Sequence, residues 1–304
     1  MGVLEQLSTG TRATLRGQHL VGRSRVCQLR LGAAEVSGTH AIFAWIDGRW
    51  TVRDLGSTNG TWLRSVRLPP REHFGMEAGS IVAFGNTTNR WRLISAAAPA
   101  PMAIDIDSEA EVCAEHQMLA LPNAENPMAS IFVDANGQWT METEGDSRAV
   151  ADLDVVEVDD RQWRLHLPDE VESTAIHGAA RPSLSNITLE FGVSRDMENV
   201  QLRALYQSEV IDLGTYAHNS VLLQLAKRRQ EDLLAGIPDA GEHGWTHVDT
   251  LARDLLLKAP LLNVSIHRAR RKLSEMRIEG SVGVIERRQG SGQIRLGTAQ
   301  FLID

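Results

Sequence analysis

The chain has 304 residues, 42% of them hydrophobic, and a net charge of −8, values that are ordinary for a soluble protein of two or three domains. No apolar run is long enough to cross a bilayer, the first 20 residues lack a signal pattern, and Cys27 and Cys113 are the two cysteines. These features exclude a membrane span and a disulfide framework, so we expect a cytoplasmic protein without a membrane partner.

Charge is distributed unevenly along the chain. Residues 1–100 carry +6, residues 101–180 carry −15 and residues 181–304 carry +1. Runs rich in Ala, Gly and Pro at 96–101 and 178–182 have the composition of linkers. We therefore predict a multidomain chain with modules at residues 1–97, 101–177 and 183–304.

The first segment contains short β-branched or aromatic runs separated by Gly, Asn or Asp turns, a pattern that predicts strands. These runs are Leu29–Leu31, Ala41–Ile46, Trp50–Asp54, Ser80–Phe84 and Trp91–Ile94. Three polar motifs lie between them, namely Gly22-Arg23, Ser37-Gly38-Thr39-His40 and Thr58-Asn59-Gly60-Thr61. We therefore expect all three motifs in loops of an all-β sandwich.

The residue types in these loops suit recognition of a phosphothreonine. Its phosphate carries close to two negative charges and three acceptor oxygens, so a reader needs a fixed cation and convergent short donors. Arg23 supplies the cation, and Ser37 and Thr58 supply hydroxyl donors. The amide of Asn59 suits the backbone of a peptide ligand, and Gly60 permits a positive-φ turn.

Together, in this order, the three motifs resemble those of the forkhead-associated (FHA) domain, a β-sandwich that binds phosphothreonine peptides. The resemblance implies that His40 is a structural residue that braces the loop behind Ser37. It also implies that Glu35 faces the third residue after the phosphothreonine and favours a basic side chain there. The alternative for each motif alone is an ordinary surface turn.

The acidic middle segment resembles a shortened copy of the first. An offset of 89 residues aligns Ile42-Phe43 with Ile131-Phe132 and Gly48-x-Trp50-Thr51 with Gly137-x-Trp139-Thr140. Trp91-Arg92-Leu93 then matches Trp163-Arg164-Leu165 after an interval that is 17 residues shorter. The counterparts of Ser37 and His40 are Asn126 and Ala129, so we expect a degenerate FHA-like β-unit without a phosphate site. Coincidence between two Gly-x-Trp hairpins is the alternative.

From Asn186 the pattern predicts strands, then three helices, then a hairpin. The strands are expected at Ile187–Phe191, Asn199–Ala204 and Glu209–Leu213, the helices at Ser220–Ala235, Val248–Leu257 and Asn263–Met276, and the hairpin at Gly283–Leu296. Asn263 is expected to be the N-cap of the third helix.

The third predicted helix has an apolar stripe at Leu262, Ile266, Ala269, Leu273 and Met276 and a basic opposite face. Residues 263–295 carry eight basic and three acidic side chains, a balance that suits DNA phosphates. The expected DNA-binding residues on the helix and hairpin are Ser265, His267, Arg268, Arg271, Lys272, Arg287, Arg288, Gln289 and Arg295. A solvated basic helix face is the alternative.

The helix core Ile-His-Arg-Ala-Arg-Arg-Lys-Leu, together with the hairpin, resembles the OmpR-type winged-helix output domain of bacterial response regulators. The resemblance implies a C-terminal α+β winged helix-turn-helix that binds double-stranded DNA.

The combination suggests a bacterial transcriptional regulator that responds to phosphothreonine. Its expected partners are a Thr-phosphorylated protein, such as a Ser/Thr kinase or its substrate, and duplex DNA; a homodimer is left open. The alternative is an adaptor that does not bind DNA and uses the winged helix for protein contacts. Ser37 and His40 lack an orienting Asp, and His243 and His247 lack further ligands, so we expect no catalytic site, metal or cofactor.

Overall fold

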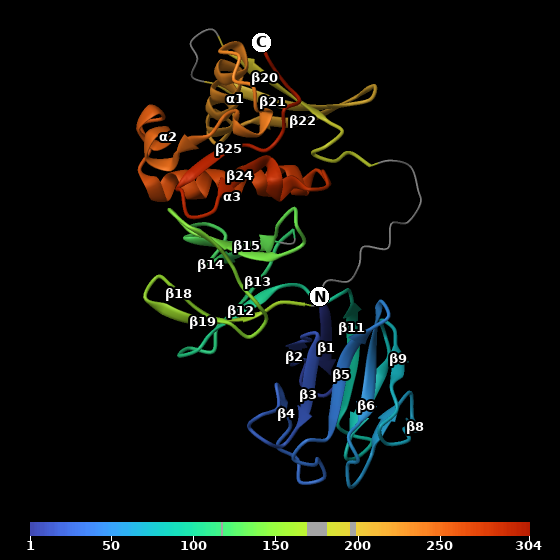
Figure 1. Cartoon of the computed structure of the whole chain (residues 1–304). Coiled ribbons are helices and arrows are strands. Elements are labelled where there is room, and N and C mark those ends of the chain that lie inside the picture. The colour runs from blue at the N-terminus through green and yellow to red at the C-terminus, as the bar shows by residue number, and fades with distance from the viewer. Residues whose placement is uncertain (117, 169–180, 195–198) are drawn as a thin grey trace. The chain divides into compact units, whose positions relative to one another are not determined.

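The computed structural model describes residues 1–116, 118–168, 181–194 and 199–304, and the chain divides into two compact units. The first unit contains residues 1–100, and the second begins at Pro101 (Figure 1). The second unit contains residues 101–167 of the acidic segment and the C-terminal module, each with its own hydrophobic core. Of the second expected linker, residues 178–180 lie outside the described residues, as do residues 169–177 of the expected middle module.

The N-terminal module is a sandwich of two sheets. One sheet has the order β2-β1-β11-β10-β7-β8 and contains β1 (Gly2–Gln6), β2 (Arg12–Thr14), β7 (Thr61–Leu63), β8 (Val66–Arg67), β10 (Ile81–Phe84) and β11 (Arg90–Ala96). The other has the order β4-β3-β5-β6-β9 and contains β3 (Gln18–Gly22), β4 (Leu29–Arg30), β5 (Ala41–Ile46), β6 (Arg49–Asp54) and β9 (Phe74–Met76). All five strands expected from the sequence are present, with ends that differ by up to two residues.

Large apolar side chains fill the space between these two sheets. Phe43, Val52 and Phe84 are completely buried, and the rings of Phe43 and Phe84 meet edge to face at 6.0 Å. Trp50 is also fully buried, and its indole N–H donates to the carbonyl of Ala97, so the first part of the expected linker belongs to this module.

The middle unit is a smaller sandwich of two four-stranded sheets. The first has the order β13-β12-β19-β18 and contains β12 (Met102–Asp105), β13 (Glu111–Cys113), β18 (Val155–Val158) and β19 (Arg161–His166). The second has the order β14-β15-β16-β17 and contains β14 (Leu119–Leu121), β15 (Ala129–Val133), β16 (Trp139–Glu142) and β17 (Ser147–Ala149).

The strand order of the middle unit repeats that of the N-terminal module. Taken in chain order, β12, β13, β18 and β19 occupy the sheet positions of β1, β2, β10 and β11. In the same way β14 to β17 occupy those of β3, β5, β6 and β9. Between Met102 and His166, Gln117 aside, the chain forms no counterpart of β4, β7 or β8, which accounts for the shorter interval between the repeated Trp motifs.

One hairpin is longer in the middle unit. The paired residues Val133 and Trp139 enclose five residues, whereas Trp45 and Trp50 enclose four. Because of this extra residue, β5 aligns with β15 at an offset of 88 residues and not at the expected offset of 89.

The expected equivalences in this strand are therefore wrong by one residue. Phe43 corresponds to Ile131, and both are fully buried in their cores. Phe132 alternates with Ile131 and so lies on the outer face of its sheet. His40, which precedes β5, corresponds to Met128 and not Ala129.

The C-terminal module packs three helices against two small sheets. The sheet with the order β22-β21-β20-β26 contains β20 (Thr188–Val193), β21 (Val200–Tyr206), β22 (Glu209–Thr215) and β26 (Phe301–Ile303). The helices are α1 (Asn219–Leu234), α2 (Val248–Asp254) and α3 (Ala259–Glu275), with the 3-10 turns η1 (Ala240–Glu242) and η2 (Ser281–Val284). The sheet with the order β23-β25-β24 contains β23 (Thr246–His247), β24 (Ile285–Arg288) and β25 (Gln293–Leu296).

Helix α3 begins four residues before the expected start. Lys258 is the N-cap, and Pro260 lies in the first turn, where a missing N–H costs nothing. The expectation that Asn263 caps the helix is therefore wrong, because Asn263 lies inside it. Met276 follows the last helical residue and is 36% exposed, so it does not belong to the apolar stripe. In the part of the chain that the structure describes, no helix has the length and apolarity to cross a membrane.

Candidate phosphopeptide-binding site

Strand register brings the three polar motifs to one end of the N-terminal sandwich. Val21 near the end of β3 pairs with Ala41 at the start of β5, and Ala41 pairs with Asp54 at the end of β6. The loops that leave these three positions therefore lie next to one another. They carry Arg23, Ser37 and residues 57–60.

Backbone hydrogen bonds join the Arg23 loop to the Ser37 loop. The N–H of Arg23 donates to the carbonyl of Ser37 at 3.0 Å, and the N–H of Ser24 donates to that of Gly38 at 2.9 Å. A Cβ at Gly22 would lie 2.2 Å from the Gly38 oxygen, so this close approach requires glycine. The Arg23 side chain is exposed, so its guanidinium is accessible to an anion.

His40 braces the Ser37 loop from behind, as the FHA resemblance implied. Its ring is fully buried, and Nδ1 accepts a hydrogen bond from the backbone N–H of Ser37 at 3.0 Å. Nε2 lies 3.0 Å from the carbonyl of Gly60, so the proton is on Nε2 and the ring is neutral. Burial lowers the pKa of His40 below its ordinary value, which also favours the neutral ring.

Asp54 holds the third loop, a role that we did not predict. Its buried carboxylate accepts hydrogen bonds from the backbone N–H groups of Gly56 and Ser57 and from the hydroxyls of Ser57 and Thr61, at 2.6 to 2.9 Å. Burial alone would raise the pKa of Asp54, but these hydrogen bonds outweigh it and lower the pKa. The spacing of Asp, Gly-Ser and Thr is the local sequence signal for such a turn.

The third loop is tied to the Ser37 loop through two side chains. The Oγ of Ser37 accepts from the backbone N–H of Thr58 at 3.1 Å, which leaves the hydroxyl proton of Ser37 for a ligand. The amide of Asn59 donates to the carbonyl of Glu35 at 2.8 Å. Gly60 has a φ of +95°, the conformation for which glycine was expected.

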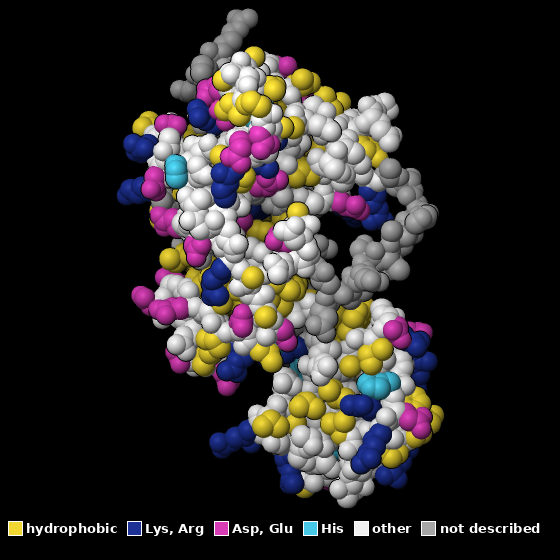
Figure 2. Space-filling model, in the orientation of Figure 1, with side chains coloured by type: hydrophobic (Ala, Val, Ile, Leu, Met, Phe, Trp, Pro, Cys, Tyr) yellow, Lys and Arg dark blue, Asp and Glu magenta, His cyan; other side chains and the backbone are white. Residues whose placement is uncertain are grey.

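The structure therefore brings the expected phosphopeptide residues together. Arg23, Thr58 and Asn59 have exposed side chains, Ser37 is half-buried between their loops, and Gly60 is buried beneath them. Glu35 is also exposed, two residues before Ser37. A guanidinium, two hydroxyls and an amide at the rim of one sandwich end can bind a phosphorylated side chain and its backbone. Figure 2 shows arginine side chains spread over the surface of this module.

The expected DNA-binding residues on α3 divide between two environments. Arg268 is exposed, and Lys272 has its ammonium 5.4 Å from the ring centre of Tyr216. His267 is only 3% exposed because the middle unit covers it, and Nδ1 lies 3.4 Å from the hydroxyl of Ser130. Burial, followed by the charges of neighbouring arginines, lowers the pKa of His267 to about 4. The expectation that His267 lies on an open basic face is therefore wrong.

The remaining residues of α3 in this set also have partners within the protein. The hydroxyl of Ser265 donates to the carbonyl of Leu261 one turn earlier at 2.9 Å. Arg271 forms ion pairs with Glu115 of the middle unit at 3.1 Å and with Glu275 at 3.0 Å.

Acidic partners neutralise the expected DNA-binding arginines of the hairpin. Arg288 pairs with Glu242 at 2.8 Å, and Arg295 pairs with Glu286 at 2.7 Å. Both guanidinium groups lie within 4.5 Å of the ring centre of Trp245, whereas Gln289 at the hairpin tip is exposed.

Arg287 differs from the other two arginines of the hairpin, because its acidic partner lies in the middle unit. Its side chain is 5% exposed and its Nε is 3.0 Å from a carboxylate oxygen of Glu142. Arg287 therefore does not lie on an open surface, contrary to our expectation. The local sequence pattern shows the charge of an arginine but not the acid that neutralises it.

His243 follows η1 and His247 ends β23, so the two histidines lie on either side of Trp245 in the chain. Nε2 of His243 lies 2.8 Å from the carbonyl of Ile237, a contact that uses one of its ring nitrogens. Within the described ranges, no group of three or more His, Cys, Asp or Glu side chains has the arrangement of a metal site.

Known proteins resemble the N-terminal part of the chain. A family model for the FHA domain matches residues 19–85. Human kanadaptin is 35% identical over 101 residues, an alignment that covers 28% of this chain and 14% of kanadaptin. The chain thus spans only a small part of that relative's length.

Several solved structures match about a third of the chain. The N-terminal FHA domain of Saccharomyces cerevisiae Rad53p, in complex with a phosphothreonine peptide, is 19% identical with a TM-score of 0.27, covering 30% of this chain and 89% of that one. Mycobacterium tuberculosis EmbR, in complex with a low-affinity phosphopeptide, is 20% identical with a TM-score of 0.29, covering 32% of this chain and 25% of that one. The match of residues 19–85 and the motif geometry agree, and the N-terminal module is an FHA domain.

Proposed function

We propose that this chain is a bacterial, cytoplasmic transcriptional regulator that responds to phosphothreonine and has no enzymatic activity of its own. The FHA module binds a Thr-phosphorylated protein, such as a Ser/Thr kinase or its substrate. The C-terminal module is a winged helix of the OmpR type, in which α3 enters the major groove of DNA and the β24–β25 hairpin is the wing.

The position of Ser37 carries the phosphopeptide part of the proposal. Its carbonyl binds the Arg23 loop, its N–H binds His40, and its hydroxyl binds the N–H of Thr58. A single serine thus joins the three loops that contain the cation, the hydroxyls and the amide. These hydrogen bonds hold the three loops together without a ligand, so fewer groups need to be ordered on binding, which reduces its entropic cost.

Calorimetry with a phosphothreonine peptide and its unphosphorylated form tests this part. Arg23→Ala removes the exposed cation without affecting the core, so we expect binding to weaken at least about tenfold while the melting temperature is unchanged. Arg49→Ala is the matched control, because Arg49 begins β6 at the end opposite Asp54. Equal affinity of the Arg23 and Arg49 variants would show that the site is assigned to the wrong loops.

Glu35 provides a test of ligand specificity. The FHA resemblance implies that Glu35 faces the third residue after the phosphothreonine. Its carbonyl accepts from Asn59 and its side chain is exposed, so we expect a basic residue to be preferred at that position. An oriented phosphopeptide library measures this preference. With Glu35→Lys the preference should reverse, and a wild type that prefers acids or shows no preference refutes the hypothesis.

The element order supports the DNA part of the proposal. A sheet precedes α1, α2 and α3, and a hairpin of two antiparallel strands follows. Arg268 and Lys272 are cations on α3 that the middle unit does not cover.

The dependence of DNA affinity on salt tests this part. Replacing a cation that binds phosphate should lower the slope of log affinity against log salt by about one. We expect this for Arg268→Ala and Lys272→Ala. Arg228→Ala is the control, because Arg228 lies on α1 and pairs with Glu231. A wild type without salt-dependent affinity for duplex DNA would refute the regulator and favour an adaptor.

One observation favours the adaptor as the second candidate. Helix α3 already contacts another part of the protein through His267, Arg270 and Arg271. Its basic side can therefore bind an acidic protein surface, and the same titration with DNA decides between the two functions.

A further inference from the structure

Helix α3 and the β24–β25 hairpin lie against the outer face of one sheet of the middle unit. In that sheet Ala120 pairs with Ser130, and Ser130 pairs with Glu142, so the three side chains form a row on one face. Their neighbours Ile131 and Met141 point into the core. The row therefore faces outward, toward α3, where Ser130 meets His267.

Glu142 is the centre of this contact. Arg270 donates to both of its carboxylate oxygens, at 2.8 and 3.2 Å, and Arg287 donates to one of them at 3.0 Å. The side chains of Glu142, Arg270 and Arg287 are 7%, 1% and 5% exposed. Burial alone would raise the pKa of Glu142, but the charge of Arg270 and its hydrogen bonds, followed by those of Arg287, lower it. The carboxylate is therefore ionised when it is in contact with the two arginines.

Arg270 connects three elements at this point. It donates to the carbonyl of Ile285 in β24 at 2.7 Å, and its guanidinium lies 4.6 Å from the ring centre of Phe132 on the outer face of β15. Since α3 and the hairpin bind the same carboxylate, they are held to the sheet together.

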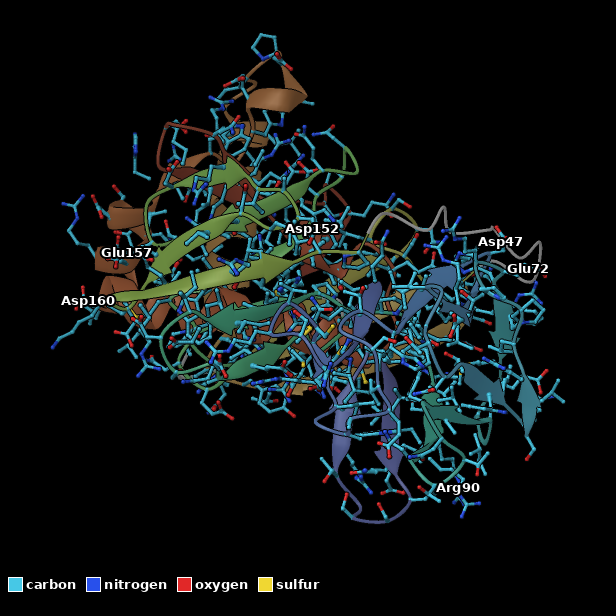
Figure 3. The ribbon with its side chains drawn as sticks, turned by 90° about the horizontal axis from the view of Figure 1, so that it is seen from below. Asp47, Glu72, Arg90, Asp152, Glu157 and Asp160 are labelled. Carbon is cyan, nitrogen blue, oxygen red and sulfur yellow. The ribbon has the colours of Figure 1, made fainter. Side chains whose placement is uncertain are left out.

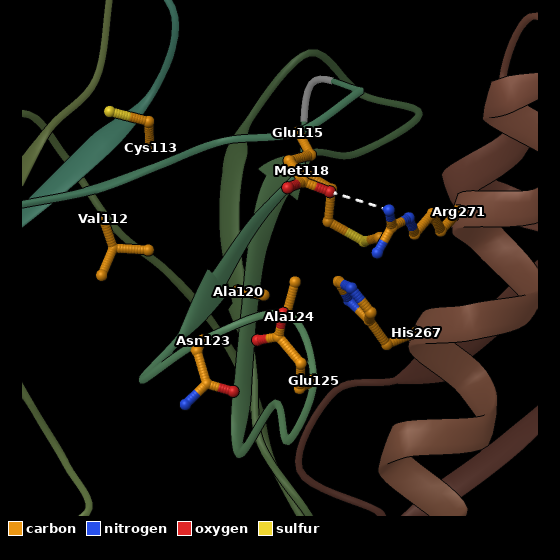
Figure 4. A pocket seen from close by; sticks show the side chains of 10 residues that line it. All are labelled: Val112, Cys113, Glu115, Met118, Ala120, Asn123, Ala124, Glu125, His267 and Arg271. Atoms are coloured by element: carbon orange, nitrogen blue, oxygen red, sulfur yellow. Dashed lines mark ion pairs between the residues drawn. The ribbon is translucent and has the colours of Figure 1, made fainter.

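The rim of the contact is weaker and contains a pocket of about 120 Å³ (Figure 4). Glu115 pairs with Arg271 across the rim, and both are partly exposed. The hydroxyl of Ser274 donates to the carbonyl of His116 at 3.3 Å. Cys113, at the end of β13 in the other sheet of the middle unit, lines the pocket together with His267 of α3.

We propose that this sheet of the middle unit is an intramolecular inhibitor of DNA binding, which holds the basic side of α3 and the hairpin through Glu142. The proposal rests on the DNA binding proposed above. The sheet covers His267, Arg270 and Arg287, so a groove of DNA cannot reach these side chains while the contact persists. A phosphate backbone and the carboxylate of Glu142 compete for the same two arginines.

The acidic charge of the middle unit fits this role. Residues 101–180 carry −15, so this segment repels DNA and attracts residues 263–295, which carry eight basic and three acidic side chains. If only a small fraction of molecules is open, the apparent DNA affinity falls by that fraction. Opening the contact should therefore increase DNA affinity without any new contact to DNA.

The full-length chain with Glu142→Gln tests the proposal. Glutamine keeps the shape of the side chain and removes the charge that holds Arg270 and Arg287. Glu157→Gln is the matched control, because Glu157 is an exposed acid on the other sheet and its loss changes the net charge equally (Figure 3). Since a buried site is altered, circular dichroism should first show that the variant is folded.

Glu115→Arg is a second variant that leaves the buried site intact. It places a like charge against Arg271 at the exposed rim, so it opens the contact without a buried defect. Glu157→Arg is its control.

Two measurements are made on each variant. The first is the rate at which a maleimide labels Cys113, with Cys27 in the FHA module as an internal reference. Cys113 is half-buried and lines the pocket at the rim of the contact, so opening the contact is expected to expose its thiol and speed labelling. The second is the affinity for random-sequence duplex DNA at several salt concentrations.

In Glu142→Gln we expect the maleimide to label Cys113 about tenfold faster and the affinity for DNA to rise about tenfold. In Glu115→Arg we expect smaller increases in both the labelling rate and the DNA affinity. Unchanged labelling in both folded variants would overturn the inhibitory contact, whatever their DNA affinity. If labelling is faster but no variant binds DNA, the proposed DNA binding is refuted. The proposed inhibition of DNA binding is then refuted as well.

Discussion

Asp54 is the residue on which the shape of the phosphopeptide site depends most directly. Its carboxylate accepts four hydrogen bonds within the loop that carries Thr58 and Asn59. Replacement by Asn keeps an oxygen for the two backbone N–H groups, and the two hydroxyls can rotate to accept from the new amide. Replacement by Ala leaves all four donors without this partner.

The expected loss of stability follows from this difference. A hydrogen bond to a charged group contributes about 1.5–3 kcal/mol, and the four bonds are not additive because they share one carboxylate. We expect Asp54→Ala to lower the free energy of unfolding by about 3–5 kcal/mol and Asp54→Asn by about 1–2 kcal/mol. For a domain of this size, each kcal/mol lowers the melting temperature by about 4–8 °C.

The pH dependence gives a second measurement. The folded pKa of Asp54 is lowered, so its contribution is complete above the ordinary carboxylate pKa and disappears as the pH falls through the lower folded value. The stability difference between the wild type and Asp54→Asn should therefore be larger at pH 7 than at about pH 3. This comparison cancels the other carboxylates, which both proteins contain.

Thermal unfolding of the N-terminal module and calorimetry with a phosphothreonine peptide are the assays. Asp47→Asn is the matched control, because Asp47, labelled in Figure 3, lies in the turn before β6, whereas Asp54 is the last residue of that strand. Its φ of 48° is one that Asn also adopts readily. If Asp54→Ala binds the peptide as tightly as Asp47→Asn does, the loop does not need the carboxylate and the reasoning is wrong.

Two further changes test the support behind the loops. Burial lowers the pKa of His40 in the folded protein, so His40 is protonated in the unfolded chain first as the pH falls. Thermal unfolding should therefore show that the wild type loses more stability than His40→Ala between about pH 7.5 and 5.5. Equal losses would show that this histidine is not held neutral. A Cβ at Gly85 would lie 2.4 Å from the Glu35 carbonyl oxygen, whereas a Cβ at Gly79 meets nothing within 4 Å; both have positive φ. Gly85→Ala should therefore weaken peptide binding in calorimetry and Gly79→Ala should not, and equal effects would show that backbone strain alone decides.

The FHA site could be predicted because its information is local. Arg23, Ser37 and Thr58 lie in loops between strands whose residue types are themselves recognisable, and the register of β3, β5 and β6 brings the loops together. The role of Asp54 depends on which donors its side chain reaches. Only the folded loop shows these donors, although the spacing from Asp54 to Ser57 and Thr61 is visible in the sequence.

The basic face of α3 was harder to predict for a physical reason. The helix period places His267 and Arg271 opposite the apolar stripe. A helix that packs through this stripe alone would expose both side chains. The partners that cover them, Ser130 and Glu115, lie more than a hundred residues earlier. An acidic segment of −15 indicates that some basic surface is close, but periodicity cannot show which row of a distant sheet faces the helix.

The two sandwiches with the same strand order have opposite electrostatic roles. In the FHA module the loops at one end present Arg23 to solvent, where a phosphate can bind. The middle unit lacks the long loop that carries Thr58 and Asn59 in the FHA module. Its buried Glu142, on the outer face of the second sheet, binds two arginines instead. Removing either arginine would leave Glu142 buried with incomplete compensation, which is strongly destabilising, so the contact tolerates little change on either side. Under the proposed inhibition, DNA would compensate the arginines but not Glu142, which regains water only when the sheet separates from α3. Release of the helix and rehydration of Glu142 are therefore a single step, and this makes the contact suited to two discrete states.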